Sequence, residues 1–138
     1  MLFRSFEIGK AKQLREGKDV AILANGDTVR LALEAAETLS TKGISARVLD
    51  VHTIKPLDVE AVTACINEIG KLITVEDHNI MNGLGSAVAE VIAEAGKGRL
   101  KRIGIQDQFG QSAPYERLLE MNGITVENII AQAEALIK

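Results

Sequence analysis

The chain has very few aromatic residues, with no Trp, one Tyr and three Phe among 138 residues. Flat surfaces on which bases or sugars stack are therefore scarce. The net charge is −3, and the sequence shows no basic patch of the kind that binds nucleic acid. No apolar run reaches the roughly 18 residues that would suggest a membrane span. These absences argue against a nucleic-acid-binding or membrane-embedded protein.

Cysteine is equally rare. Cys65 is the single cysteine, so it forms no internal disulfide and cannot hold zinc by itself. Its position within a helical apolar stripe indicates a core residue rather than a nucleophile. Residues 1–5 lack the apolar stretch of a secretory signal, and we therefore expect a reducing, cytoplasmic setting.

What the chain does contain is typical of a globular protein. It is 46% apolar and 25% charged, which excludes a disordered chain. The length predicts one domain over residues 1–138, in which residues 1–19 form an N-terminal arm and an edge strand at 6–8. Short apolar runs, first at 20–24, alternate with apolar stripes at helical spacing, which predicts a mostly parallel sheet covered on both faces. The other expected strands lie at 46–51, 72–75 and 102–105.

Three loops follow the expected parallel strands, at residues 25–28, 51–53 and 76–79. In an open parallel sheet, ligands bind beyond the carboxyl ends of the strands. The only two histidines, His52 and His78, both lie there. An acid–base role is one interpretation, and packing at a strand end is the favoured one. No His-x-x-x-His spacing is present, so we expect no metal.

Two helix starts are candidate sites for a small anion, because the first N–H groups of a helix have no partner within it. The residues concerned are Gly26, Asp27, Thr28, His78, Gly83, Gly85 and Ser86. Residues 83–86 resemble half of a dinucleotide-binding fingerprint, but Val88 stands where the third glycine would be. The simpler interpretations are a tight entry into a packed helix at residues 83–86 and a side-chain N-cap by Asp27. Asp58 and Thr125 are likewise predicted to cap the helices that follow them.

No catalytic constellation is visible in the sequence. Glu76 and Asp77 are adjacent, and neighbouring residues of a strand point to opposite faces, so we do not expect them to act as an acid–base pair. The sequence contains neither a Walker A motif nor a Gly-x-Ser-x-Gly motif. We therefore predict no catalytic residue in this chain.

Eight short segments resemble the C-terminal domain of transketolase. They are FEIGK at 6–10, LREGKDV at 14–20, VLD at 48–50, IKPLD at 54–58, TVEDH at 74–78, GLGSAVAE at 83–90 and FGQSAPY at 109–115, followed by GIT at 123–125. The early segments are shared with deoxyxylulose-phosphate synthases and the β subunits of 2-oxoacid dehydrogenases. The FGQSAPY segment is the part that favours transketolase.

The resemblance implies a three-layer α/β/α sandwich around a five-stranded mixed sheet. Four strands would be parallel, and one antiparallel strand near residues 6–8 would form an edge. The strand at 20–24 would be central, between the strands at 46–51 and 72–75.

The resemblance also implies a function. Transketolases of the pentose phosphate pathway transfer two-carbon ketol units between sugar phosphates, using thiamine diphosphate and Mg²⁺. The family's diphosphate-binding motif is absent here, so the chain is expected to be a non-catalytic assembly domain or fragment that binds neither cofactor. Its expected partners are other transketolase domains or subunits, with a homodimeric parent enzyme and neither nucleic acid nor membrane.

Two alternatives stay open. The chain could be a free-standing regulatory module that binds a small anion or nucleotide at its helix starts. It could also be the C-terminal domain of a deoxyxylulose-phosphate synthase or of a 2-oxoacid dehydrogenase β subunit.

Overall fold

A computed structural model describes residues 9–79, 83–106 and 113–138. Its strands are β1 (Lys12–Arg15), β2 (Val20–Ala24), β3 (Ala46–Asp50), β4 (Lys71–Asn79) and β5 (Arg99–Ile105). They form one five-stranded sheet in the order β1-β3-β2-β4-β5, in which β1 is antiparallel to β3 and the other pairs are parallel. The predicted mixed sheet with a central strand at 20–24 is confirmed.

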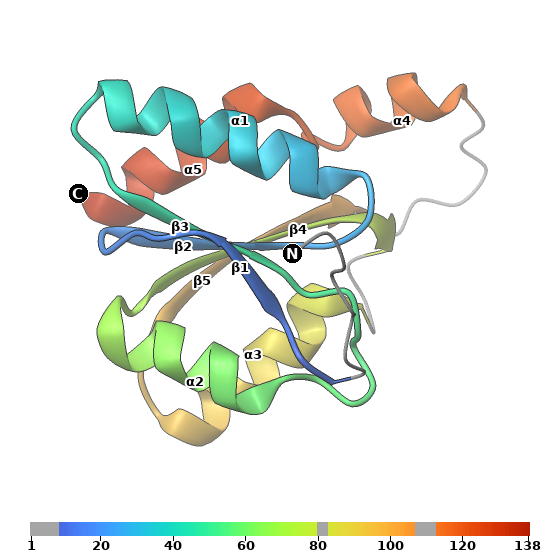
Figure 1. Ribbon diagram of the computed structural model, residues 1–138. Helices are drawn as coiled ribbons and strands as arrows, with labels where there is room; N and C mark the ends of the chain where they lie inside the picture. Colours follow the sequence, from blue (N-terminus) through green and yellow to red (C-terminus); the bar gives the residue numbers. More distant parts are fainter. Residues whose placement is uncertain (1–8, 80–82, 107–112) are drawn as a thin grey trace, which may run out of the picture.

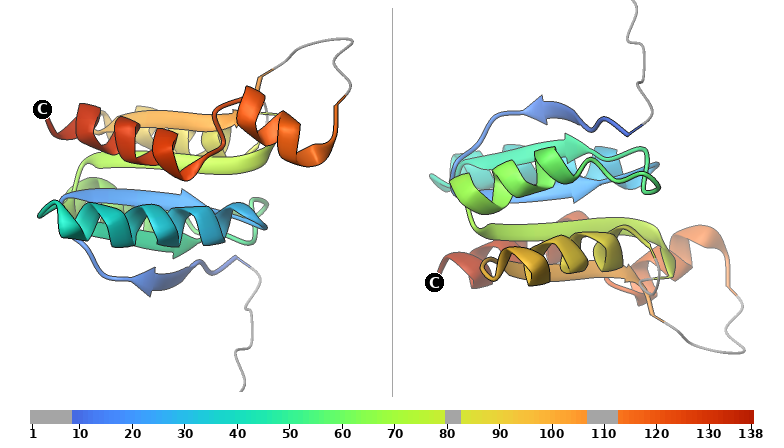
Figure 2. Two further views of the ribbon diagram at one scale, coloured as in Figure 1. Left: turned by 90° about the horizontal axis from the view of Figure 1, so that it is seen from above. Right: turned by 90° about the horizontal axis from the view of Figure 1, so that it is seen from below.

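Helices cover both faces of the sheet. They are α1 (Thr28–Thr41), α2 (Val59–Glu68), α3 (Leu84–Ala95), α4 (Tyr115–Met121) and α5 (Val126–Ile137). Figure 1 shows α1 and α5 on one face and α2 and α3 on the other, and the views of Figure 2 show the same layers. The three-layer α/β/α arrangement is therefore confirmed.

The core is divided in two by the sheet. All five residues of β2 are buried. Val20, Ile22 and Ala24 pack in the cluster beneath α1 and α5, whereas Ala21 and Leu23 pack in the cluster beneath α2 and α3. Burial on both faces explains why this strand is a continuous apolar run instead of an alternating one.

The antiparallel edge strand differs in position from the prediction. It is β1, at Lys12–Arg15, whereas residues 6–8 lie outside the described residues. Strand β1 is partly exposed, because an edge strand has one neighbour and buries little surface. Its residues are accordingly mostly polar. Its place is fixed instead by pairing with β3, from Lys12 opposite Asp50 to Arg15 opposite Val48.

The starts of three helices test predicted caps. Asp58 accepts a hydrogen bond from the Ala61 N–H at the start of α2, and Thr125 accepts one from the Asn128 N–H at the start of α5. Both caps are confirmed. The predicted side-chain cap at Asp27 is wrong, since this carboxylate makes no cap hydrogen bond to α1.

Candidate functional site

The carboxyl ends of β2 and β4 form the topological switch point of the sheet. The connection after β2 leads to β3 on one side, and the connection after β4 leads to β5 on the other. Open α/β sheets bind ligands at this place. Two of the helices that start here, α1 after β2 and α3 after β4, carry the predicted anion-site residues.

At the start of α1, Thr28 forms the side-chain hydrogen bonds, and they lead to the chain before the helix and to β4. The buried Thr28 Oγ1 lies 2.6 Å from the Asn25 carbonyl oxygen and 2.8 Å from the Val75 carbonyl oxygen, so its single hydroxyl proton is shared between these two acceptors. This contact joins the α1 start to β4. Gly26 has a φ of +60°, a left-handed conformation that favours glycine in the tight turn before the helix.

Asp27 takes part in a different contact, which sequence reasoning missed. The Tyr115 hydroxyl lies 2.6 Å from Asp77 Oδ2 and 3.3 Å from Asp27 Oδ2. Three separate elements therefore meet here: the turn after β2, the end of β4 and the start of α4. Two carboxylates beside this helix start disfavour an anionic ligand at Gly26, Asp27 and Thr28.

At the start of α3, a carboxylate of the chain itself lies where an anionic ligand would bind. Glu76 is completely buried, and its two carboxylate oxygens accept hydrogen bonds from the Leu84 and Gly85 N–H groups, each at 2.8 Å. A carboxylate at this position also complements the positive end of the helix dipole. The two amides are therefore already bound, and ligand binding by Gly83, Gly85 and Ser86 stays a prediction that this geometry disfavours.

Gly85 has a packing role. A Cβ atom at this position would lie 2.9 Å from Arg102 Cδ and 3.0 Å from Thr74 Oγ1, closer than side chains normally approach. Absence of a side chain lets α3 lie close to β4 and β5. The structure thus favours the interpretation of residues 83–86 as a tight entry into a packed helix.

Glu76 and Asp77 diverge as the strand geometry predicts. Glu76 accepts hydrogen bonds from two N–H groups of α3. Asp77 accepts one from the Tyr115 hydroxyl, on the opposite side of the sheet. The sequence prediction placed both residues in a loop, whereas β4 continues through them to Asn79 because it pairs with β5 as far as Ile105.

The histidines and the cysteine lie on different elements of the fold. His52 follows β3 and His78 lies within β4, and these strands flank β2 on opposite sides. Cys65 is on the buried face of α2, and burial raises the pKa of its thiol despite the opposing effect of Arg47. A thiol with a raised pKa is a poor nucleophile, in agreement with the predicted core role.

The helix starts at the switch point do not fit thiamine diphosphate. A diphosphate needs free N–H donors or cations, whereas at the switch point the α3 amides bind Glu76 and the α1 start faces two carboxylates. Within the described ranges, no group of three or more His, Cys, Asp or Glu residues could hold a metal. Likewise, none of the helices in the described part is long and apolar enough to cross a membrane.

We expect the Tyr115 hydroxyl to titrate at a higher pH in the folded chain than in the unfolded chain. Its hydrogen bond to Asp77 raises the pKa, and the nearby carboxylate charges add to this effect. The stabilisation from this contact is complete below about pH 10, the ordinary pKa of tyrosine, and is lost as the pH rises through the folded pKa.

The measurement is direct, because Tyr115 is the only tyrosine and the chain has no Trp. Ultraviolet absorbance of tyrosinate then reports on one group, compared between the folded chain and the chain in urea. An Asp77→Asn variant should lower the folded midpoint towards the ordinary value. Equal midpoints for the folded and unfolded chains would contradict the contact.

Fold and site together define an α/β module whose polar groups at the switch point are bound largely by one another. The family model described as "Transketolase, C-terminal domain" matches residues 9–129. The chain belongs to this family.

Several relatives agree with this assignment. The 6-deoxy-6-sulfo-D-fructose transketolase subunit SqwH of Clostridium sp. (strain MSTE9) is 45% identical over 93% of this chain. A putative transketolase C-terminal section of Methanocaldococcus jannaschii is 47% identical over 91% of it. The 1-deoxy-D-xylulose-5-phosphate synthase 1 of Geobacter sulfurreducens is 43% identical over 97% of it.

A solved structure is also similar. It is titled "Split gene transketolase, inactive beta4 tetramer", is 40% identical, and superimposes with a TM-score of 0.89 over 96% of this chain. The chain spans only part of these proteins: 43% of the solved chain, 40% and 39% of the two transketolase relatives and 21% of the synthase.

Proposed function

We propose that the chain is the non-catalytic assembly domain of a transketolase that transfers two-carbon ketol units between sugar phosphates. The observation that carries this proposal is the match to the C-terminal domain over residues 9–129, in a chain that spans about two fifths of its transketolase relatives. Thiamine diphosphate and Mg²⁺ would be bound by other sections of the parent enzyme, which would work in the cytoplasm on pentose phosphates.

The bonds at the switch point support a structural role. Thr28 and Tyr115 each join two elements that are distant in the sequence, and Glu76 joins the end of β4 to the start of α3. These bonds stabilise the ends of the strands and would give the partner sections a rigid body to pack against. Those partners would be transketolase sections or subunits, within a homodimeric enzyme.

A domain exchange tests the proposal. Residues 9–138 replace the matching part of the Clostridium SqwH subunit, and ketol transfer by the complete enzyme is measured. We expect activity within about tenfold of the natural subunit, equal to about 1.4 kcal/mol in barrier height. A chimaera that folds and assembles but is no more active than the subunit truncated before this domain would overturn the proposal.

The same exchange in the Geobacter synthase addresses the alternative parent enzyme. The chain is 43% identical to that protein and 45% identical to SqwH, so overall identity does not separate the two. If this is a transketolase domain, a larger fraction of the host activity should survive in SqwH than in the synthase. The reverse result would make the synthase the parent.

The regulatory-module alternative predicts ligand binding by the chain alone. An anion present at a free concentration of 100 times its dissociation constant would raise the free energy of unfolding by about 2.7 kcal/mol. Because the α3 amides bind Glu76, we expect no shift in unfolding temperature with sugar phosphates or nucleotides. A clear shift that is lost when Gly26 or Ser86 is replaced would favour the regulatory module.

A further inference from the structure

The start of β5 carries a local concentration of positive charge. Residues 97–102, KGRLKR, hold four of the 16 Lys and Arg residues of the chain and no acidic residue, although acidic residues outnumber basic ones overall. This segment corrects the expectation, based on the charge of the whole chain, that no basic patch is present. Lys97, Arg99 and Lys101 are all exposed.

A hydrogen bond places the end of α5 beside this segment. The Arg99 guanidinium donates to the Leu136 carbonyl oxygen at 3.0 Å, so the last turn of α5 lies beside the start of β5 (Figure 2). Ile137 and Lys138 follow directly; both are exposed, and Ile137 is 37% exposed. The basic edge surface is our name for five residues: Lys97, Arg99, Lys101, Ile137 and Lys138.

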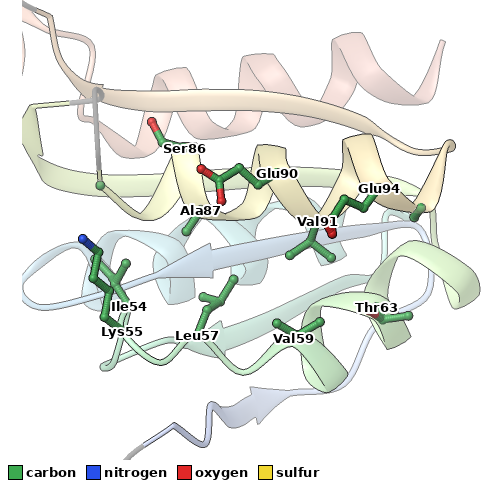
Figure 3. A pocket seen from close by; sticks show the side chains of 12 residues that line it. Ile54, Lys55, Leu57, Val59, Thr63, Ser86, Ala87, Glu90, Val91 and Glu94 are labelled. Atoms are coloured by element: carbon green, nitrogen blue, oxygen red, sulfur yellow. The ribbon is translucent and has the colours of Figure 1, made fainter.

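The chain itself does not neutralise the basic edge surface. Within residues 9–79, 83–106 and 113–138, none of its four cations is in an ion pair. The nearest acidic residues that precede it in the sequence, Glu90 and Glu94, line a groove between α3 and the segment that leads into α2 (Figure 3). On α5, Glu134 pairs with Lys42 instead. Carboxylates from outside the chain would therefore be attracted here.

The residues of this surface suit an acidic polypeptide better than a nucleic acid. Proteins that bind single strands stack bases on aromatic side chains, and none of the five residues is aromatic. An exposed isoleucine among cations instead suits a protein interface, which combines an apolar centre with a polar rim. Arg99 and Lys101 share one face of β5, roughly 6.6 Å apart, which is also the spacing of alternate residues in an extended polypeptide.

We propose that the basic edge surface docks an extended, acidic segment of a partner section of the parent enzyme. Carboxylates at alternate positions of the segment pair with Arg99 and Lys101, a further carboxylate pairs with Lys97, and an apolar side chain contacts Ile137. This inference rests on the assembly role proposed above, and it adds the chemistry of the partner.

A peptide with glutamates at alternate positions tests the surface. The probe is fluorescein-labelled Glu-Ser-Glu-Val-Glu-Ser-Glu, and its fluorescence anisotropy is followed as the full chain is added. We expect saturable binding with a dissociation constant below about 1 mM, weakening as salt is added, because salt screens exposed charges. The double variant Lys97→Glu, Lys101→Glu should weaken binding at least tenfold, because it replaces attraction by repulsion.

Two further variants serve as controls. Lys18→Glu combined with Lys55→Glu changes the net charge equally at exposed positions outside the surface, and binding should stay within about twofold of the wild type. Ile137→Ser should weaken binding without changing its salt dependence, because it removes an apolar contact and no charge. Circular dichroism checks that each variant is folded.

Absence of saturable binding would overturn the proposal, as would equal weakening by the two double variants. Tighter binding of an oligothymidylate than of the peptide would also overturn it and make a nucleic acid the occupant. In the SqwH chimaera, the double variant Lys97→Glu, Lys101→Glu should lower the fraction of assembled enzyme, measured by sedimentation. Unchanged assembly would show that the partner is not a section of the parent enzyme, which would overturn the proposal.

Failure of this inference is distinguishable from failure of the proposed function. An active chimaera, together with a chain that does not bind the peptide, would overturn the docking surface and leave the assembly role in place. Selective peptide binding together with an inactive, assembled chimaera would overturn the assembly role, and with it the assignment of the acidic segment to the parent enzyme.

Discussion

Replacing Glu76 with alanine should lower the free energy of unfolding by about 3–5 kcal/mol. The change removes two charge-assisted hydrogen bonds and leaves the Leu84 and Gly85 N–H groups buried without acceptors, each at a cost of roughly 1.5–2.5 kcal/mol. Because the side chain is completely buried, water cannot take its place without opening the structure. Urea unfolding measures the loss.

A second readout separates loss of the cap from a general loss of packing. Hydrogen exchange at the Leu84 and Gly85 amides should accelerate more than exchange in β2. Glu76→Gln keeps one carbonyl acceptor and should cost less than the alanine variant. Glu34→Ala removes an exposed carboxylate that pairs with Arg30, and it should cost no more than about 0.5 kcal/mol. A loss below about 1 kcal/mol for Glu76→Ala would contradict the assigned role.

Gly17→Ala should destabilise the chain by about 3 kcal/mol, the upper end of the usual cost of overpacking. A Cβ atom at Gly17 would lie 2.1 Å from the carbonyl carbon of Ala46 and 2.1 Å from the backbone nitrogen of Arg47. These are backbone atoms of β3, which cannot move aside as the end of a flexible side chain can. The turn between β1 and β2 would have to separate from β3.

Gly43→Ala is the matched control for the glycine prediction. Gly43 has a φ of +79° after α1, but an added Cβ atom meets nothing within 4 Å. Its replacement should cost about 1 kcal/mol, the ordinary strain of a left-handed residue with a side chain. Comparison of urea midpoints distinguishes contact from strain, and an equal loss for the two variants would disprove the close approach at Gly17.

Much of the fold could be predicted from short stretches of sequence. The run at 20–24 predicts a strand buried on both faces, since five consecutive apolar residues suit a strand between two helical layers. Asp58 and Thr125 cap their helices as predicted, because a cap depends on neighbours within three residues. The edge strand β1 was misplaced because a polar, partly exposed strand carries no apolar period.

The candidate site was less predictable. The glycines at 83 and 85 suggested a free helix start, and nothing local to them reveals that Glu76 binds its amides. Adjacent acidic residues at 76 and 77 were correctly predicted to diverge, but their partners could not be read from spacing. Tyr115 is 38 residues from Asp77 in the sequence, so their contact follows only from the position of α4.

By itself, the sequence determined the alternation of strands and helices, two of the helix caps and the resemblance to a transketolase C-terminal domain. These features depend on periodicity and capping over a few residues, where backbone geometry limits the choices. Only the tertiary structure decided that Glu76 binds the amides at the α3 start and that Asp27 and Asp77 share the Tyr115 hydroxyl. The physical reason is that crossover connections bring distant segments together, and the energy of a buried charge depends on which partner arrives there.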